Sequence, residues 1–110
     1  MSSKPLAFVI DDDRSLGEAF VQALEISGFT ARHIIDSTEA LNQIIEHQPD
    51  VVMLDMQMPK MNGAQVLKAI RDNEKTSQVK VIVATANRFA VDTTIEEMAD
   101  LVLQKPVSLS

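Results

Sequence analysis

The sequence contains no cysteine, tryptophan or tyrosine, and only three glycines and four prolines among its 110 residues. Without cysteine it can form no disulfide and offers no thiolate nucleophile, which excludes disulfide-stabilised secreted domains and cysteine enzymes. No apolar run approaches the roughly 20 residues of a membrane-spanning helix, and the first run is too short for a secretory signal. We therefore expect a cytoplasmic chain that does not enter a membrane.

Positive charge is also scarce, with 10 basic residues against 16 acidic ones and a formal net charge of −6. This balance argues against a nucleic-acid-binding surface, which needs a basic patch, and against docking on anionic lipid. A length of 110 residues and an apolar fraction of 45% suit one domain, residues 1–110, with one packed core. The composition thus predicts a small, acidic, globular domain.

Short apolar runs and stretches with helical spacing alternate along the chain. The runs predict strands at 6–10, 29–35, 51–54, 79–84 and 101–103. Apolar residues three or four positions apart predict helices at 14–27, 36–48 and 63–73, and a shorter one within 91–100. Gly28 is expected to end the first helix, and Asp36 or Ser37 to cap the second. Such alternation predicts an α/β domain with a parallel sheet and helices on both faces.

The polarity of the runs predicts the order of the strands. Runs 6–10, 51–54 and 79–84 are dominated by apolar residues, as expected of central strands that are buried on both faces. The run at 29–35 carries polar residues and suits an edge of the sheet. With right-handed crossovers, these positions favour the order 2-1-3-4-5, which is a flavodoxin-like three-layer sandwich. A different strand order built from the same elements is the alternative.

In the favoured order, the carboxyl ends of all strands lie at one rim of the sheet, where ligands bind in such folds. The polar residues that follow the strands at this rim are Asp11, Asp12, Asp13, Asp55, Thr85 and Lys105. Crowded carboxylates raise one another's pKa, and a divalent cation offsets their repulsion. Mg²⁺ prefers one or two carboxylates together with water and phosphate oxygens, and an ammonium group attracts phosphate. The rim therefore predicts a site for Mg²⁺ and a phosphoryl group.

Each of these residues also has an ordinary structural interpretation. An acidic run after a strand is often a solvated loop or a helix cap, and a single Asp there is often a turn residue. Thr85 alone would reflect β-propensity. His33 and His47 are expected at the surface, and the methionines are expected to be packing residues. Only the joint placement of the rim residues favours a functional site.

Four stretches, "FVIDDD", "VVMLDMQMPKMNG", "VIVATA" and "ADLVLQKPV", resemble the receiver domain of two-component response regulators in order and spacing. The resemblance implies that Asp55 accepts a phosphoryl group from the phosphohistidine of a sensor histidine kinase or a phosphotransfer protein. It also implies Mg²⁺ as cofactor, bound by Asp12, Asp55 and the backbone carbonyl of Gln57. Asp11 would act largely through a metal-bound water. Asp13 falls outside the usual acid pair and is expected to cap a helix or lie in a loop.

The resemblance assigns roles to other residues of the rim. Lys105 would bind a phosphoryl oxygen, and Thr85 would move to hydrogen-bond the phosphoryl group and so report its presence. Pro59 and Gly63 would have structural roles in the loop after the third strand. The bond between Lys105 and Pro106 is usually cis in this family, so we expect a cis bond here.

The sequence departs from the family pattern at two points. Val102 stands three residues before Lys105, where the family usually has the Tyr or Phe of a rotamer switch. The family's fifth helix is missing after "KPV", so we expect one face of the sheet to expose several Val, Ile and Leu side chains. A continuation of a longer natural chain, a partner, or a second copy of the domain would then cover that face.

The implied function is that of a signalling domain, which catalyses only its own phosphorylation and dephosphorylation and switches contact with an unknown output partner. Two other functions compete with it. An aspartyl-phosphate phosphatase of the haloacid dehalogenase type needs a second Asp two residues after the nucleophile, where this sequence has Gln57. A receiver-like domain that only binds partners would have lost Asp11, Asp12, Asp55 or Lys105, and all of these are present.

Overall fold

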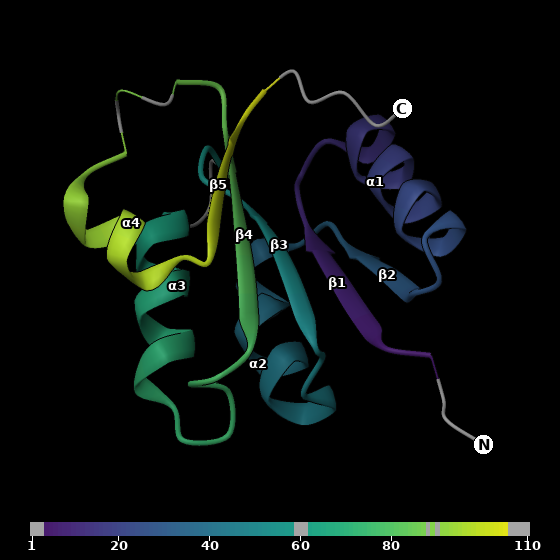
Figure 1. Ribbon diagram of the computed structural model, residues 1–110, viewed down its shortest axis with the longest axis horizontal. Helices are drawn as coiled ribbons and strands as arrows, with labels where there is room; N and C mark the ends of the chain where they lie inside the picture. The colour runs from purple at the N-terminus through teal and green to yellow at the C-terminus, as the bar shows by residue number, and fades with distance from the viewer. Residues whose placement is uncertain (1–3, 59–61, 88, 90, 106–110) are drawn as a thin grey trace.

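The computed structural model describes residues 4–58, 62–87, 89 and 91–105 (Figure 1). The strands are β1 (Leu6–Ile10), β2 (Thr30–Ile34), β3 (Val51–Asp55), β4 (Lys80–Thr85) and β5 (Leu101–Gln104). The helices within these residues are α1 (Arg14–Ile26), α2 (Ser37–His47), α3 (Gly63–Asp72) and α4 (Thr93–Met98). Every predicted element is present, and most boundaries lie within two residues of the predicted ones. Pro59 and Pro106 lie outside the described residues.

All five strands are parallel and form one sheet in the order β2-β1-β3-β4-β5, which confirms the predicted order. Helix α1 covers one face of the sheet, and α2, α3 and α4 cover the other (Figure 1). The polar strand β2 lies at one edge, as predicted. The opposite edge is β5, so β1, β3 and β4 occupy the centre.

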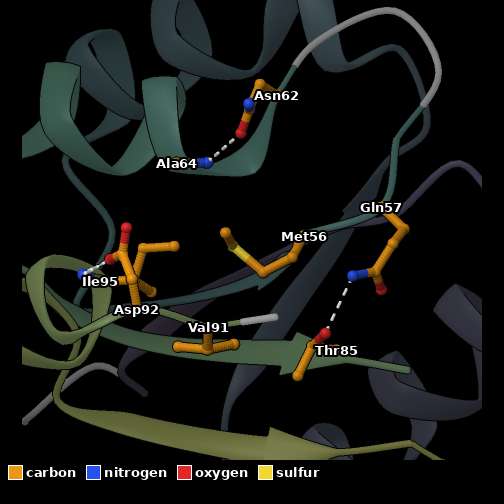
Figure 2. A pocket seen from close by; sticks show the side chains of 8 residues that line it. All are labelled: Met56, Gln57, Asn62, Ala64, Thr85, Val91, Asp92 and Ile95. Atoms are coloured by element: carbon orange, nitrogen blue, oxygen red, sulfur yellow. Dashed lines mark hydrogen bonds between the residues drawn. The ribbon is translucent and has the colours of Figure 1, made fainter. Parts of the chain in front are cut away.

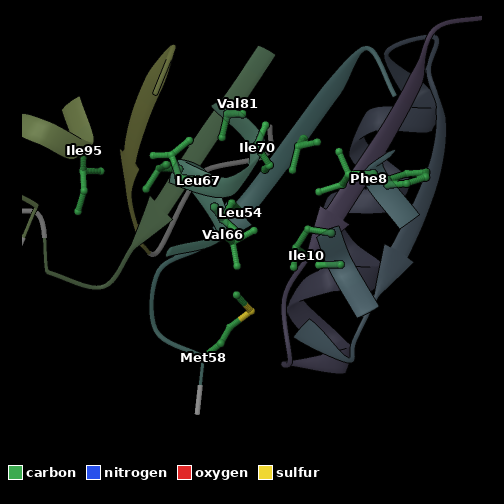
Figure 3. Close-up of a cluster of buried hydrophobic side chains, with 13 residues drawn as sticks. Phe8, Ile10, Leu54, Met58, Val66, Leu67, Ile70, Val81 and Ile95 are labelled. Carbon is green, nitrogen blue, oxygen red and sulfur yellow. The ribbon is translucent and has the colours of Figure 1, made fainter. Parts of the chain in front are cut away.

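Most of the apolar core lies between the sheet and the three-helix face. Phe8 and Ile10 of β1 and Leu54 of β3 point to this side, where Leu67 and Ile70 of α3 pack against them (Figure 3). Side chains alternate across a strand, so their neighbours Val9 and Met53 point to the other face. There they pack against Phe20 of α1. The sheet is therefore buried on both faces at its centre.

Short polar side chains start each helix. The Asp13 carboxylate accepts a hydrogen bond from the Leu16 amide at 3.0 Å and caps α1, which is one of the two roles expected for that residue. Of the two predicted caps for α2, Asp36 is the one used. Asn62 and Asp92 cap α3 and α4 in the same way. These caps satisfy amide groups that have no partner inside their own helix.

The sheet face beside α1 exposes less apolar surface than expected. Leu101 of β5 is 50% exposed, while Ile82 and Leu103 are partly buried. Among the described strand residues, Leu101 is the one large hydrophobic side chain in open contact with solvent. The prediction that several apolar side chains would be exposed on this face was therefore wrong in their number. The reason is that α1 already covers Val9 and Met53.

None of the helices in the described part of the chain is both long enough and apolar enough to cross a bilayer.

Candidate functional site

The acidic residues predicted at the carboxyl rim lie together. Each of Asp11, Asp12 and Asp55 offers a carboxylate oxygen, and the three oxygens lie within 4.8 Å of one another. The sheet register explains this proximity, because Ile10 pairs with Leu54, and Asp11 and Asp55 are the residues that follow these two partners. Asp11 and Asp55 are buried, whereas Asp12 is exposed. The arrangement is a small acidic cluster that opens to solvent on the side of Asp12.

Backbone amides orient the two buried carboxylates. The Asp13 amide donates to Asp11 Oδ1 at 2.9 Å, and the Gln57 amide donates to Asp55 Oδ1 at 3.1 Å. Both are turns in which an Asp side chain accepts from the residue two positions on, a local preference of this residue type. The sequence around each strand end therefore fixes its own carboxylate.

Within the described residues, Lys105 is the one lysine whose ammonium group lies near these carboxylates. Its Nζ lies 3.1 Å from Asp55 Oδ1 and 3.5 Å from Asp11 Oδ2. Its backbone amide donates to the Thr85 carbonyl at 2.7 Å, which ties the end of β5 to the end of β4. The ammonium group thus reaches the cluster from a strand two places away from β3.

The contact with Lys105 does not fully offset the effect of burial on the Asp55 carboxylate. Burial is the main cause that raises the pKa of the Asp55 carboxyl above its usual range, and the nearby Asp11 raises it further. The Gln57 amide and the Lys105 ammonium group lower the pKa but do not cancel the effect. A site with buried carboxylates and too little positive charge is suited to bind a hard cation through oxygen.

Thr85 ends β4 at the same rim and is completely buried. Its hydroxyl donates to the Asn87 carbonyl at 3.1 Å and accepts from the Asn87 amide at 3.2 Å. It also accepts from the side-chain amide of Gln57 at 2.9 Å (Figure 2). Beside it lies a cavity of about 280 Å³, lined by Met56, Gln57, Asn62, Ala64, Thr85, Val91, Asp92 and Ile95 (Figure 2).

Gly63 opens α3 directly against the end of β3. A Cβ at this position would lie 2.8 Å from the Met56 Cα and 2.9 Å from the Asp55 carbonyl oxygen. Both neighbours are backbone atoms, so a side chain here would displace the strand end that carries Asp55. This gives a physical reason for glycine at position 63.

His33 is a residue of the site region that sequence reasoning missed. It was expected at the surface, but it is partly buried, and its Nε2 lies 2.7 Å from the Asp11 carbonyl oxygen, to which it donates. Its ring fills the space where a side chain at Gly17 would stand. Glycine in a helix interior is unfavourable by roughly 1 kcal/mol relative to alanine, so Gly17 was a signal of close packing in α1.

Comparison with known proteins identifies the family. A profile described as "Response regulator receiver domain" matches residues 7–110, which is almost the whole chain. The chain belongs to this family. The resemblance seen in the sequence is confirmed, and so is its place in two-component signalling.

Curated relatives of this receiver domain are longer proteins. It is 38% identical over 100 residues to the DNA-binding response regulator MtrA of Mycobacterium tuberculosis, covering 89% of this chain and 42% of that protein. It is 35% identical over 111 residues to the transcriptional regulatory protein PrrA of Mycobacterium leprae, covering 98% of this chain and 46% of that one. The receiver domain thus spans less than half the length of these relatives.

Solved structures share its fold. A CheY-like receiver domain from Methylobacillus flagellatus superposes with a TM-score of 0.89 at 24% identity, covering 97% of this chain and 91% of that one. The response regulator TrrA from Thermotoga maritima, solved in complex with Mg²⁺ and BeF, gives a TM-score of 0.86 at 25% identity. That match covers 96% of this receiver domain and 90% of TrrA.

Proposed function

We propose that this receiver domain accepts a phosphoryl group on Asp55 from the phosphohistidine of a sensor histidine kinase or a phosphotransfer protein. The observation that carries the proposal is the position of the Asp55 carboxylate, which is buried at a strand end close to Asp11, Asp12 and the Lys105 ammonium group. A structural turn residue would not need two further carboxylates and an ammonium group, drawn from two other segments of the chain.

The donor set fits Mg²⁺. Carboxylate and carbonyl oxygens are the ligands that this cation prefers, and it usually retains several waters. Asp12, Asp55 and the backbone carbonyl of Gln57 would hold the cation directly, with Asp11 acting through a bound water. When bound, Mg²⁺ supplies positive charge for the phosphoryl oxygens and offsets the repulsion among the carboxylates.

The phosphoryl transfer itself needs only the carboxylate as nucleophile. One Asp55 oxygen attacks phosphorus as the phosphorus–nitrogen bond of the phosphohistidine breaks, and the electron pair returns to the imidazole, which binds a proton from solvent. The product is an acyl phosphate on Asp55. Lys105, already 3.1 Å from Asp55 Oδ1, would hold a phosphoryl oxygen and orient the group for in-line attack.

Signalling then depends on movement of Thr85. Its hydroxyl would leave the Asn87 carbonyl and hydrogen-bond the phosphoryl group, which changes the loop between β4 and α4. An output partner would read this change, and water would later remove the phosphoryl group. The domain would thus catalyse only its own phosphorylation and dephosphorylation, without binding nucleic acid directly.

Intact-mass analysis tests the proposal. The domain is incubated with Mg²⁺ and acetyl phosphate, and we expect the mass of one phosphoryl group to be added in a base-labile form. Asp55→Asn should gain nothing, because its amide cannot form the acyl phosphate. Asp13→Asn is the matched control, since it retains the cap of α1, and it should be phosphorylated like the wild type. An unchanged mass gain in Asp55→Asn would refute the assignment.

A further inference from the structure

The side chain of Gln57 connects the loop after β3 to the loop after β4. Its Nε2 donates to Thr85 Oγ1 at 2.9 Å, and its Oε1 accepts from the Ala86 amide at 2.9 Å. These partners are 28 and 29 positions away in the sequence. Gln57 is exposed, and an exposed glutamine has no need of such contacts for solvation. Both ends of its amide are nevertheless engaged.

With the hydrogen bond from Gln57, the donor and both acceptor positions of the Thr85 hydroxyl are occupied. A hydroxyl has one proton to donate and two lone pairs to accept with. The proton goes to the Asn87 carbonyl, and the lone pairs accept from the Asn87 amide and from Gln57. Thr85 can therefore donate to a phosphoryl oxygen only after it gives up the Asn87 carbonyl, and any rotation of its side chain also disturbs the bond from Gln57.

We propose that the Gln57 side chain is a latch that holds Thr85 in its unphosphorylated position and competes with the phosphoryl group for it. The inference rests on the proposed function of Asp55 and Thr85. Because Oε1 also binds the Ala86 amide, the latch restrains the loop after β4 and not only the hydroxyl. Gln57 is thus a positioning residue: it acts on the switch through Thr85, whereas its backbone carbonyl is the proposed Mg²⁺ ligand.

The cavity beside the latch gives the loop room to move. Gln57 and Thr85 line it on one side, and Val91 and Ile95, from the loop and α4, line it on another (Figure 2). Release of Gln57 from Ala86 would free this loop at its start. The cavity of about 280 Å³ is the space into which we expect the start of this loop to move.

The test uses Gln57→Met, which retains the length of the side chain and removes both hydrogen bonds. Beryllofluoride with Mg²⁺ serves as a stable analogue of the phosphoryl group, and its affinity is measured by calorimetry. One neutral hydrogen bond shifts an equilibrium by about two- to tenfold. We expect Gln57→Met to bind beryllofluoride tighter by a factor in that range. Gln65→Met, at an exposed position of α3, is the matched control and should bind like the wild type.

The same substitution is then made in a Thr85→Val background, which separates a latch from a general effect on the site. Loss of Thr85 weakens analogue binding by itself, and the gain from Gln57→Met should become smaller, because no hydroxyl remains to be released and only the bond to the Ala86 amide is still lost. Affinity for Mg²⁺ alone is measured for each variant, so that any change in metal binding is separated from the change in beryllofluoride affinity. Gln57→Ala is the second variant, and thermal melting verifies that each protein is folded.

The outcomes distinguish the latch from the function on which it rests. If the wild type binds beryllofluoride but Gln57→Met and Gln57→Ala bind no tighter, or if the gain persists undiminished with Thr85→Val, the latch is refuted and the phosphoacceptor proposal stands. If the wild type binds no beryllofluoride in the presence of Mg²⁺, the proposed function fails and the latch fails with it.

Discussion

The Lys105 ammonium nitrogen lies 3.1 Å from Asp55 Oδ1, although 50 positions separate the two residues in the sequence. Both side chains are largely buried, with 18% of the Lys105 side chain and 4% of the Asp55 side chain exposed. The electrostatic attraction in a contact this well shielded from water is stronger than in a surface ion pair, because solvent screens it less. It opposes the effect of burial on Asp55 and holds the ammonium group where a phosphoryl oxygen is proposed to bind.

The first prediction concerns the ionisation of Asp55. Burial raises its pKa, and Lys105 counteracts that rise. Lys105→Met should therefore move the pKa of Asp55 still higher, so that the carboxyl gains its proton at a higher pH than in the wild type. A ¹³C NMR titration of the carboxyl groups without Mg²⁺ measures the shift.

The matched control for this titration is Lys68→Met, because Lys68 pairs with Asp72 on the exposed side of α3. It should leave the Asp55 titration unchanged. Since phosphorylation needs the carboxylate form, Lys105→Met should also lose acceptor reactivity earlier as the pH falls. A pKa of Asp55 that is equal or lower in Lys105→Met would contradict the role assigned to the ammonium group.

The second prediction concerns Mg²⁺. Asp12→Ala removes a proposed direct ligand and should weaken Mg²⁺ binding by about tenfold or more. Asp13→Asn should weaken it much less, because Asp13 caps α1 and is not in the three-carboxylate cluster. The chain has no Trp, so calorimetry or NMR titration is the suitable measurement. Equal losses from the two substitutions would show that the wrong acid was assigned to the metal.

The third prediction concerns the packing of His33 against α1. In an ordinary helix, Gly17→Ala would stabilise the protein by roughly 1 kcal/mol through helix propensity. Here the added Cβ would overlap the His33 ring, which donates to the Asp11 carbonyl, so we expect a loss of about 1–3 kcal/mol. Urea unfolding measures the difference.

A double-mutant cycle verifies the cause of that loss. His33→Ala makes room for the methyl group, so Gly17→Ala should be neutral or stabilising in that background. If Gly17→Ala destabilises both backgrounds equally, the clash with His33 is not its origin.

The fourth prediction concerns Arg71, which joins the end of α3 to three other segments. Its guanidinium group donates to the Met98, Ser77 and Val79 carbonyls at 2.8, 3.0 and 2.6 Å and to Asp100 Oδ2 at 3.0 Å. Lysine cannot reproduce this planar set of donors, so Arg71→Lys should cost about 2 kcal/mol of unfolding free energy.

The contrast for Arg71 is Lys68→Ala on the same helix. Lys68 makes a largely exposed pair with Asp72, which is worth only about 0.3–0.5 kcal/mol. Thermal or urea unfolding compares the two variants. Equal losses would mean that the Arg71 network contributes no more than a surface ion pair.

Much of the fold could be predicted because its signals are local. Strand β3 appears in the sequence as an apolar run that ends at Asp55, and helix α1 as apolar residues at helical spacing before Gly28. Parallel strands place their ends at one rim, so the meeting of Asp11, Asp12 and Asp55 followed from strand order alone. The choice of Asp36 over Ser37 as a cap did not follow, since both residue types serve equally well.

Contacts between distant side chains could not be predicted in the same way. His33 was expected at the surface, but the edge strand β2 still has one face against a helix, and Gly17 leaves space for the ring there. The sequence did not reveal the four hydrogen-bond acceptors of Arg71. They are three backbone carbonyl oxygens and one carboxylate oxygen, which only folding brings together.

By itself, therefore, the sequence determined the alternation of strands and helices, and it favoured the strand order that brings the acidic residues to one rim, because these depend on periodicity and chain connectivity. Only the tertiary structure decided that Lys105 reaches both Asp11 and Asp55, and that the Gln57 amide binds Thr85. Such contacts depend on side-chain directions and distances of a few ångströms across neighbouring strands. A linear pattern of residue types does not specify them, since each polar group has many partners of the right chemistry and packing selects among them.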